Sequence, residues 1–312
     1  MRILSTLPIK DEQRTEVQGI KQGAEYLHIE NFKEHDEKAE ILVVFAKPLR
    51  AEELGNYPNL RWIQMMSAGV DNLPLAELAK RGIILTNARG AHQVQMTEHV
   101  MWSLLTLFRQ AHVYIRQQEQ KLWNSGVKLD EMYGKTVCIV GAGRIGEAVA
   151  EKCQGFGMTV LGISKSGTSH PAFDQVGDLQ ELDAFLGMSD AVVVLLPLTQ
   201  ETERFFNARR FAAMKRGTYF VNVARGPVVD EEALAAALEK GQVGAAALDV
   251  FVKEPLPEES HLWSMQNVVI TPHIGGRSPY YNRRTFEIFL NNLRAYPERK
   301  QMANVIDLRR GY

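Results

Sequence analysis

The chain has 312 residues, 45% of them hydrophobic, which is enough to bury one large or two ordinary cores without disulfides or structural metals. Its 36 basic and 37 acidic residues leave a net charge of −1, so no overall field attracts nucleic acid or an anionic membrane. The longest apolar run, residues 191–198, is far shorter than the roughly 18 to 20 residues of a membrane helix, and we expect no signal peptide. Cys138 and Cys153 lie in core-like segments, which is typical of reduced thiols. We expect a cytoplasmic protein without a metal site.

Short β-branched runs alternate with amphipathic stretches through the first third of the chain. This alternation indicates parallel βα units. The predicted strands are 3–7, 41–46, 61–66 and 83–86.

The stretch 94–123 contains no proline or glycine and has apolar residues at Val100, Leu104, Leu107 and Phe108. This spacing predicts one long helix or two helices in series. Such a helix could bridge two domains or form a dimer surface, and the alternative is a helix buried in its own domain.

A second alternation begins at Lys135 and is typical of a doubly wound nucleotide-binding sheet. Asp230 and Gly241 are placed as the N-cap and C-cap of a helix over 231–240, and another helix is predicted over 283–295 before a basic tail, 307–312. We expect the chain to leave a first domain, 1–98, build a second, 99–282, and return to the first over 283–312. The six predicted strands of the second domain are 136–140, 159–163, 191–196, 218–223, 245–250 and 268–271.

Gly141, Gly143 and Gly146 form a G-x-G-x-x-G motif between a predicted strand and a predicted helix. In that context the glycines allow a tight turn, close approach of the backbone to a pyrophosphate, and helix packing. Arg144 within the loop could add a phosphate contact, with a solvated side chain as the alternative. The motif predicts dinucleotide binding, and the alternative is a purely structural strand-to-helix turn.

The acidic residue that binds the ribose 2′-hydroxyl of NAD is missing from the end of the next strand, where Ser164 and Lys165 stand. A hydroxyl followed by a cation suits a 2′-phosphate, whereas a carboxylate there repels it. We predict NADP(H) as the preferred cofactor, with NAD(H) as the alternative if Lys165 is only a solvated surface residue.

Three polar loops follow three later predicted strands. They carry Arg225 in 221–226, Asp249 and Glu254 in 248–256, and His273 in 271–276. Because the carboxyl ends of parallel strands share one edge of a sheet, an arginine, a carboxylate and a histidine are expected to converge there. The structural alternatives are an ordinary loop histidine, an arginine that only caps or pairs, and an acid that merely precedes a proline.

Over nearly its full length the chain resembles the D-isomer-specific 2-hydroxyacid dehydrogenases. The resemblance rests on the glycine loop, the three polar loops, residues 67–71, 97–99, and 196–199 with Thr202. Within that family, the missing acid, the chain length and the closing residues 310–312 are most similar to the bacterial glyoxylate/hydroxypyruvate reductase A group.

The resemblance implies an α/β fold of two doubly wound parallel-sheet domains, the larger a Rossmann dinucleotide-binding domain inserted into a discontinuous flavodoxin-like substrate domain. It implies NADPH-dependent reduction of a small 2-oxo acid. Arg225 would hold the substrate carboxylate and polarise the ketone. His273 would give a proton to the forming alkoxide, and Glu254 would favour the imidazolium and orient the ring.

In that family's arrangement, backbone amides of Ala68 and Gly69 bind the substrate carboxylate from the other domain, and closure of the cleft expels water. Asp249 would face the nicotinamide carboxamide, and Pro197 and Thr202 would line the adenosine side. The full set of expected cofactor-binding residues is Thr97, Gly141, Gly143, Arg144, Ile145, Gly146, Ser164, Lys165, Pro197, Thr202, Val223, Asp249 and Gly275.

Two other functions remain open from sequence alone. One is a broader or NADH-using D-2-hydroxyacid dehydrogenase with another side-chain preference, such as a phenylpyruvate reductase. The other is a non-catalytic protein whose binding is gated by cofactor, although the net charge of −1 weighs against it. We expect a homodimer with a small 2-oxo acid as its partner, and neither nucleic acid nor a membrane.

Overall fold

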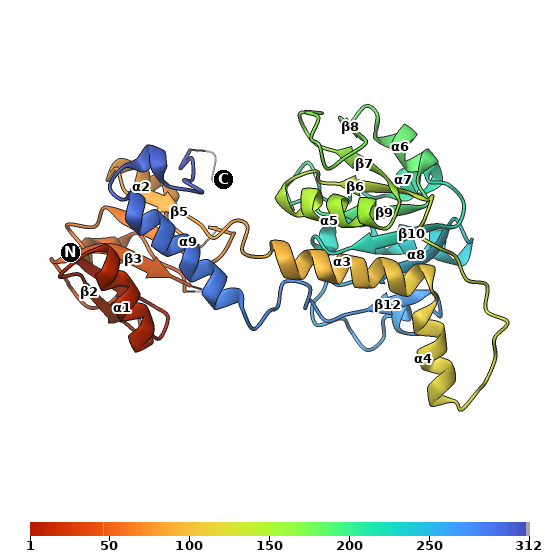
Figure 1. Ribbon diagram of the computed structural model, residues 1–312, viewed down its shortest axis with the longest axis horizontal. Helices are drawn as coiled ribbons and strands as arrows, with labels where there is room; N and C mark the ends of the chain where they lie inside the picture. The colour runs from red at the N-terminus through yellow and green to blue at the C-terminus, as the bar shows by residue number, and fades with distance from the viewer. Residues whose placement is uncertain (46, 71, 310–312) are drawn as a thin grey trace. The chain divides into compact units, whose positions relative to one another are not determined.

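The computed structural model describes residues 1–45, 47–70 and 72–309. The chain divides into two compact units, unit 1 (Met1–Ala91 with Ser278–Tyr312) and unit 2 (His92–Arg277), coloured along the chain in Figure 1. The sequence predicts this division at 98/99 and 282/283. Both observed boundaries lie earlier. The first turn of helix α3 (Gln93–Phe108) belongs to unit 2, and the returning helix α9 (Tyr281–Ala295) begins before the predicted residue 283. At the start of α3 the ring Nδ1 of His92 and the side-chain amide of Gln95 each lie 3.3 Å from the carbonyl oxygen of Gly276.

Unit 1 holds a five-stranded parallel sheet in the order β2-β1-β3-β4-β5. This is the flavodoxin-like order, and four of its strands are those predicted from sequence. The strand β2 escapes prediction because only Tyr26 of its four residues is buried. The strands are β1 (Arg2–Ser5), β2 (Glu25–His28), β3 (Ala39–Val44), β4 (Trp62–Met65) and β5 (Ile84–Thr86).

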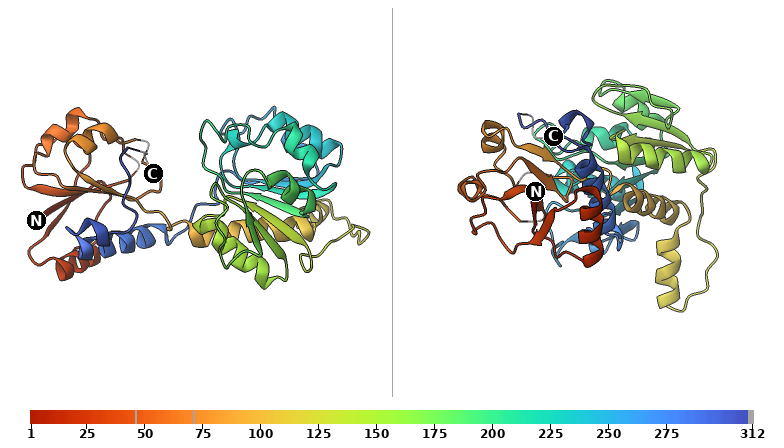
Figure 2. Two further views of the ribbon diagram at one scale, coloured as in Figure 1. Left: turned by 90° about the horizontal axis from the view of Figure 1, so that it is seen from above. Right: turned by 60° about the vertical axis from the view of Figure 1, so that its left-hand side comes forward.

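Helices cover both faces of this sheet (Figure 2). The helices α1 (Asp11–Ile20) and α9 (Tyr281–Ala295) pack side by side on one face, where Trp62, Phe286 and Phe289 are almost completely buried. The other face is covered by α2 (Leu75–Lys80) and the short helix η1 (Glu52–Asn56). The segment that returns to unit 1 therefore completes its core, and η4 (Arg299–Gln301) follows α9.

Unit 2 holds a seven-stranded parallel sheet in the order β12-β11-β10-β9-β6-β7-β8. Counted from β6, this is the Rossmann order with one strand added at the edge, and it confirms the predicted fold class. The six predicted strands are present, and β8 is an additional strand with a single buried residue. The strands are β6 (Thr136–Val140), β7 (Thr159–Ile163), β8 (Gln175–Gly177), β9 (Ala191–Val194), β10 (Thr218–Asn222), β11 (Val243–Leu248) and β12 (Val268–Ile270).

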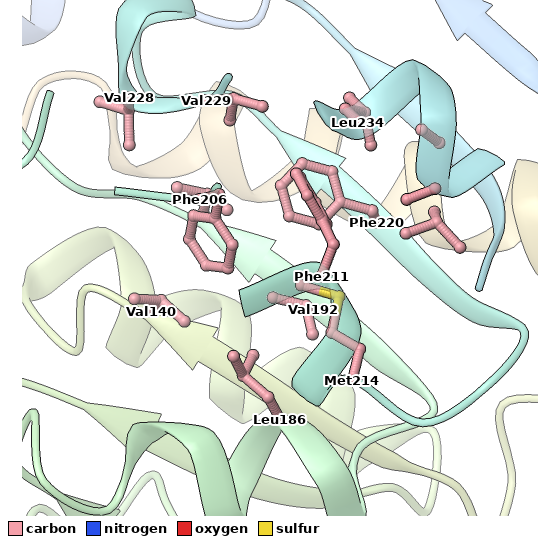
Figure 3. Packing of buried hydrophobic residues seen from close by; sticks show 14 of the residues in the cluster. Val140, Leu186, Val192, Phe206, Phe211, Met214, Phe220, Val228, Val229 and Leu234 are labelled. Carbon is pink, nitrogen blue, oxygen red and sulfur yellow. The ribbon is translucent and has the colours of Figure 1, made fainter. Parts of the chain in front are cut away.

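Helices also cover both faces of the second sheet (Figure 2). On one face α3 and α5 (Arg144–Gly155) pack together. The two cysteines are buried and form no disulfide, Cys153 in the cluster on this face and Cys138 in the cluster on the other. Burial raises the pKa of each thiol to about 12, so both stay protonated. On the other face Phe206, Phe211 and Phe220 interlock (Figure 3). The helices there are α6 (Leu182–Met188), α7 (Ala208–Ala213) and α8 (Glu231–Glu239), with η2 (Gly226–Val228) and η3 (His261–Trp263) in the loops.

The predicted stretch 94–123 forms two helices in series, α3 and α4 (Ala111–Glu119). The break lies at Gln110, whose φ of 54° is left-handed and cannot continue a right-handed helix. The apolar stripe of α3 is buried within unit 2, with Val100 and Leu104 fully covered, whereas α4 extends away from the sheet (Figure 1).

The predicted caps of α8 are present. The Asp230 carboxylate accepts a hydrogen bond from the Ala233 amide at 3.1 Å, and Gly241 follows the helix with a φ of 66°. Among the described residues no helix is long and apolar enough to cross a membrane.

Candidate active site

The glycine loop and all three polar loops leave the same edge of the sheet in unit 2. The strands β6, β9, β10, β11 and β12 are consecutive neighbours and run parallel, so the segments after their carboxyl ends lie together. Gly141 follows β6, Arg225 follows β10, Asp249 follows β11 and His273 follows β12. This arrangement is the convergence that the sequence predicts, at the edge where doubly wound sheets bind ligands.

His273 and Glu254 form a direct pair, with 2.7 Å between the ring Nδ1 and the carboxylate Oε2. The other oxygen of Glu254 accepts the Phe251 amide at 3.0 Å. Burial alone raises the pKa of Glu254, but the hydrogen bonds from His273 and Phe251, with the charges of His273 and Arg225, lower it overall. The carboxylate therefore stays ionised and fixes the imidazole ring. Within the described chain no hydrogen bond occupies Nε2 of His273, whose side chain is 47% exposed.

The backbone at His273 is unusual because its φ of 52° lies in the left-handed region. Its amide donates to the carbonyl oxygens of Asp249, at 2.9 Å, and Thr271, at 3.0 Å. The carboxylate of Asp249 in turn accepts the amides of Ile274 and Gly275, both at 2.9 Å. These bonds impose a conformation on His273 that a free loop does not favour.

Arg225 stands on a loop that passes against the loop of Glu254. A Cβ built on Gly226 would lie 1.9 Å from the carbonyl carbon of Phe251, so only glycine fits between the two backbones. The guanidinium of Arg225 is exposed and donates to the Ala224 carbonyl at 2.7 Å. This close approach places the positive charge of Arg225 near Glu254, whose pKa it helps to lower.

The three glycines of the loop after β6 meet different constraints. A Cβ on Gly141, whose φ is 116°, would lie 2.9 Å from the Leu195 backbone, and one on Gly146 would lie 2.4 Å from the Gly141 carbonyl oxygen. A Cβ on Gly143 meets no protein atom within 4 Å. Protein packing therefore explains two of the glycines, and the open space at Gly143 fits a bound pyrophosphate.

Backbone donors are available at the same point. Gly143 is the N-cap of α5, and among the described residues no hydrogen bond uses the amides of Arg144 or Ile145. Free amides at a helix N-terminus attract a phosphate. The residues present therefore fit a dinucleotide cofactor.

Ser164 and Lys165 lie after β7, with no acidic residue at the end of the strand. The Ser164 hydroxyl accepts the Gly167 amide at 3.1 Å. The Lys165 ammonium lies 3.2 Å from the carboxylate of Glu201, and the two side chains are 84% and 77% exposed. The preference of this site for a 2′-phosphate stays a prediction.

The other expected cofactor residues all have partners or packing of their own. The Thr97 hydroxyl is buried and donates to the Gln93 carbonyl at 2.7 Å within α3, and Thr202 donates to the Pro197 carbonyl at 2.6 Å. Val223 is buried after β10. Asp249 is only 3% exposed, and its oxygens bind the His273 loop. Its role toward a carboxamide stays a prediction.

Ala68 and Gly69 follow β4 in unit 1 and are exposed. The Asn87 side chain donates to the Ala68 carbonyl at 2.6 Å, and the Ser67 hydroxyl donates to the Gly69 carbonyl at 2.9 Å. Among the described residues no hydrogen bond uses the amides of Ala68 and Gly69, which is compatible with an anion ligand. Asp71, the last residue of the motif 67–71, and the closing residues 310–312 lie outside the described residues.

Sequence reasoning missed two polar residues beside the reactive loop, His99 and Thr271. His99 falls in the predicted helical stretch 94–123, and no role is assigned to it from sequence. In the structure its Nε2 lies 3.3 Å from the Thr271 hydroxyl and 3.6 Å from the Asp249 carboxylate. The one sequence feature that could have indicated a role for His99 is its place as a polar residue on the buried side of a helix. Its partners Thr271 and Asp249 are far away in sequence, so they could not be predicted.

A nucleotide-binding sheet with an arginine and an acid-paired histidine at its carboxyl edge defines a class of protein, the nicotinamide-dependent dehydrogenases. Comparison with known proteins specifies the family. Residues 101–275 match the model of the D-isomer specific 2-hydroxyacid dehydrogenase, NAD binding domain. The chain belongs to the D-isomer specific 2-hydroxyacid dehydrogenase family and is an NAD(P)-dependent dehydrogenase.

Relatives extend the likeness over both units. A glyoxylate reductase from Pyrococcus furiosus is 35% identical over 266 residues, covering 82% of this chain and 78% of its own. A family member from Xanthobacter autotrophicus, solved with NADPH and MES, superposes with a TM-score of 0.81 at 32% identity, covering 100% of this chain and 99% of its own. An NADPH-dependent glyoxylate/hydroxypyruvate reductase from Sinorhizobium meliloti, solved with NADP and sulfate, has the same TM-score at 29% identity and the same coverage.

Proposed function

We propose that the protein reduces small 2-oxo acids, glyoxylate and hydroxypyruvate, to 2-hydroxy acids with NADPH. The observation that carries this proposal is the His273–Glu254 pair beside Arg225 at the edge of the nucleotide-binding sheet. When bound, the reduced cofactor supplies a hydride to the ketone carbon. His273 gives the proton that the forming alkoxide oxygen needs, from its Nε2 side, while Glu254 holds Nδ1.

Arg225 binds the substrate carboxylate with its planar guanidinium and polarises the ketone. In unit 1 the free backbone amides of Ala68 and Gly69 are the groups proposed to bind a carboxylate. The amides of Arg144 and Ile145 bind the pyrophosphate at the start of α5.

The preference for NADPH is supported by Ser164 and Lys165 in place of the acid that binds a 2′-hydroxyl. It is also supported by the structural neighbours from Xanthobacter autotrophicus and Sinorhizobium meliloti, which are complexes with NADPH and NADP. The names of the relatives support a small polar substrate. These names and the motifs favour the glyoxylate/hydroxypyruvate reductase group.

The first experiment follows the near-ultraviolet absorbance of the reduced nicotinamide, with NADPH and NADH in parallel against glyoxylate, hydroxypyruvate, pyruvate and phenylpyruvate. Fast NADPH oxidation with the two small polar acids supports the proposal. Preference for NADH or bulky acids assigns a different member of the family, and no turnover favours a cofactor-gated binding protein.

Two variants test the assigned roles. His273→Gln is expected to lower kcat by about 10²- to 10⁴-fold with little change in cofactor affinity, because only the proton donor is lost. Arg225→Ala is expected to raise the KM for the oxo acid as well as lower kcat. An unchanged KM would remove Arg225 from the carboxylate role.

We further propose a homodimer in which α4 and the segment after it contact a second copy. The support is the exposure of three apolar side chains, Ile115, Leu122 and Trp123, which are 58%, 51% and 98% exposed. The helix α4 projects from the rest of unit 2 (Figure 1). Light scattering after size exclusion tests the assembly. A concentration-independent mass near 35.1 kDa refutes it, and Trp123→Ser is expected to weaken the dimer.

A further inference from the structure

Asp249 is the centre of a buried polar cluster at the end of β11. One carboxylate oxygen accepts the Thr271 hydroxyl at 2.6 Å and the Ile274 amide at 2.9 Å. The other oxygen accepts the Gly275 amide at 2.9 Å. A carboxylate that is 3% exposed requires such donors, because an unpaired buried charge is very costly. The cluster therefore ties the segment 271–275 to the end of β11.

His99 of α3 completes this cluster from another element. Its Nε2 lies 3.3 Å from the Thr271 hydroxyl oxygen and 3.6 Å from the Asp249 carboxylate, and its side chain is 12% exposed. The single hydroxyl proton of Thr271 is already donated to Asp249, so the contact with His99 requires a hydrogen on Nε2. Burial lowers the pKa of His99, although Asp249 opposes the shift, so the ring is neutral near pH 7. The hydrogen bonds run from His99 to Thr271 to Asp249.

The packing around this chain of hydrogen bonds is tight. A Cβ on Gly275 would lie 2.9 Å from the Asp249 carboxylate and 3.2 Å from the ring of His99. The His99 ring also packs against Trp102, with 5.4 Å between ring centroids. Because α3 packs against β10, β11 and α5, it is a rigid support for the loop.

We propose that His99 and Thr271 are positioning residues for the proton donor His273. The amide of His273 donates to the carbonyls of Asp249 and Thr271, so two members of the cluster hold the residue in its left-handed conformation, and His99 acts through Thr271. That conformation directs the ring toward Glu254 at 2.7 Å. The inference rests on the proposed function, in which His273 is the general acid.

The test compares variants that remove or retain one donor. Thr271→Val keeps the side-chain shape and removes the hydroxyl, and Thr271→Ser keeps the hydroxyl. We expect the valine variant to lower kcat about tenfold, with the KM for glyoxylate and the Kd for NADPH within about twofold of wild type. The serine variant is expected to recover kcat to within about threefold. His99→Phe and His99→Gln form the matched pair on α3, because glutamine retains an N–H donor.

A double variant separates positioning from bulk stability. If His99 and Thr271 act through one chain of hydrogen bonds, the loss in the His99→Phe/Thr271→Val protein is smaller than the product of the single losses. A wild-type kcat in Thr271→Val overturns the proposal, and so does an equal kcat loss in the serine and valine variants. If Thr271→Val does not fold, Thr271→Ser is compared with wild type and His99→Phe with His99→Gln, and these comparisons test the same proposal. An active His273→Gln protein refutes the proposed function itself, whereas an inactive His273→Gln beside a fully active Thr271→Val refutes only the positioning role.

Discussion

Gly143 and Gly146 belong to one motif, yet the structure predicts opposite consequences for the same substitution. Gly146→Ala places a Cβ 2.4 Å from the Gly141 carbonyl oxygen, about 1 Å inside an ordinary contact. We expect a net loss of about 2 kcal/mol in the free energy of unfolding, after a gain of about 1 kcal/mol from the better helix propensity of alanine. Gly143→Ala meets no protein atom within 4 Å and has an extended φ of −98°, so its stability should stay within about 0.5 kcal/mol of wild type.

For cofactor affinity the expected order is the reverse, because Gly143→Ala should weaken binding more than Gly146→Ala. The Cβ at position 143 enters the space that we assign to the pyrophosphate and removes at least one charge-assisted hydrogen bond. That loss corresponds to about 10- to 100-fold in Kd. At 100 times its Kd, NADPH stabilises the wild-type protein by about 2.7 kcal/mol. A variant with 100-fold weaker affinity gains only about 0.4 kcal/mol at the same concentration.

Thermal unfolding with and without NADPH measures both effects in one experiment. Without cofactor, Gly146→Ala should unfold about 4 to 8 °C below wild type, and Gly143→Ala should unfold close to it. With cofactor, Gly143→Ala should shift upward by about half of the wild-type amount or less, the smaller shift corresponding to the larger loss of affinity. A normal shift in Gly143→Ala refutes the pyrophosphate assignment, and a large loss of cofactor-free stability in that variant refutes the packing argument.

Three further changes test the fold and its dependence on pH. Gly226→Ala should cost about 3 kcal/mol or more in denaturant unfolding, because its Cβ would lie 1.9 Å from the Phe251 backbone. Asp230→Ala should cost about 1 kcal/mol at pH 7 through loss of the N-cap. The hydrogen bond from Arg204 lowers the pKa of Asp230, so this difference is present above pH 4 and shrinks as the pH falls below about 4. Burial lowers the pKa of His112, so wild type should lose stability below about pH 6.5 and His112→Phe should lose less.

Each of these expectations has a contrary result. A Gly226→Ala protein with wild-type stability would mean that the two loops separate easily. A constant difference between wild type and Asp230→Ala from pH 3 to 8 would exclude a contribution from the ionised cap. Identical acid profiles for wild type and His112→Phe would show that other groups control acid unfolding. His112 is a direct candidate because, among the described residues, its Nδ1 is one of the buried polar atoms without a hydrogen-bond partner.

The strands that sequence predicts and those it misses differ in how much of each strand is buried. All five residues of β6 are at least partly covered, and both faces are apolar, so the run stands out in the sequence. The edge strands β2 and β8 each bury a single residue and carry no such pattern. The position of the helix break at Gln110 could not be predicted from sequence either. Glutamine favours helices, and its left-handed conformation depends on how α3 and α4 pack.

The reactive residues could be found because each follows a strand, and parallel strands place their carboxyl ends together whatever the length of the crossovers. From that rule alone, before any distance is measured, Arg225, Glu254 and His273 are expected to lie close together. The rule does not show which contacts hold these three side chains in position. The clearance at Gly226 is set by Phe251, and the left-handed backbone of His273 is held through Asp249 and Thr271. These constraints join residues distant in the chain, so they emerge only when the loops are packed. The local sequence therefore indicates which groups react, and tertiary packing determines whether they are aligned to do so.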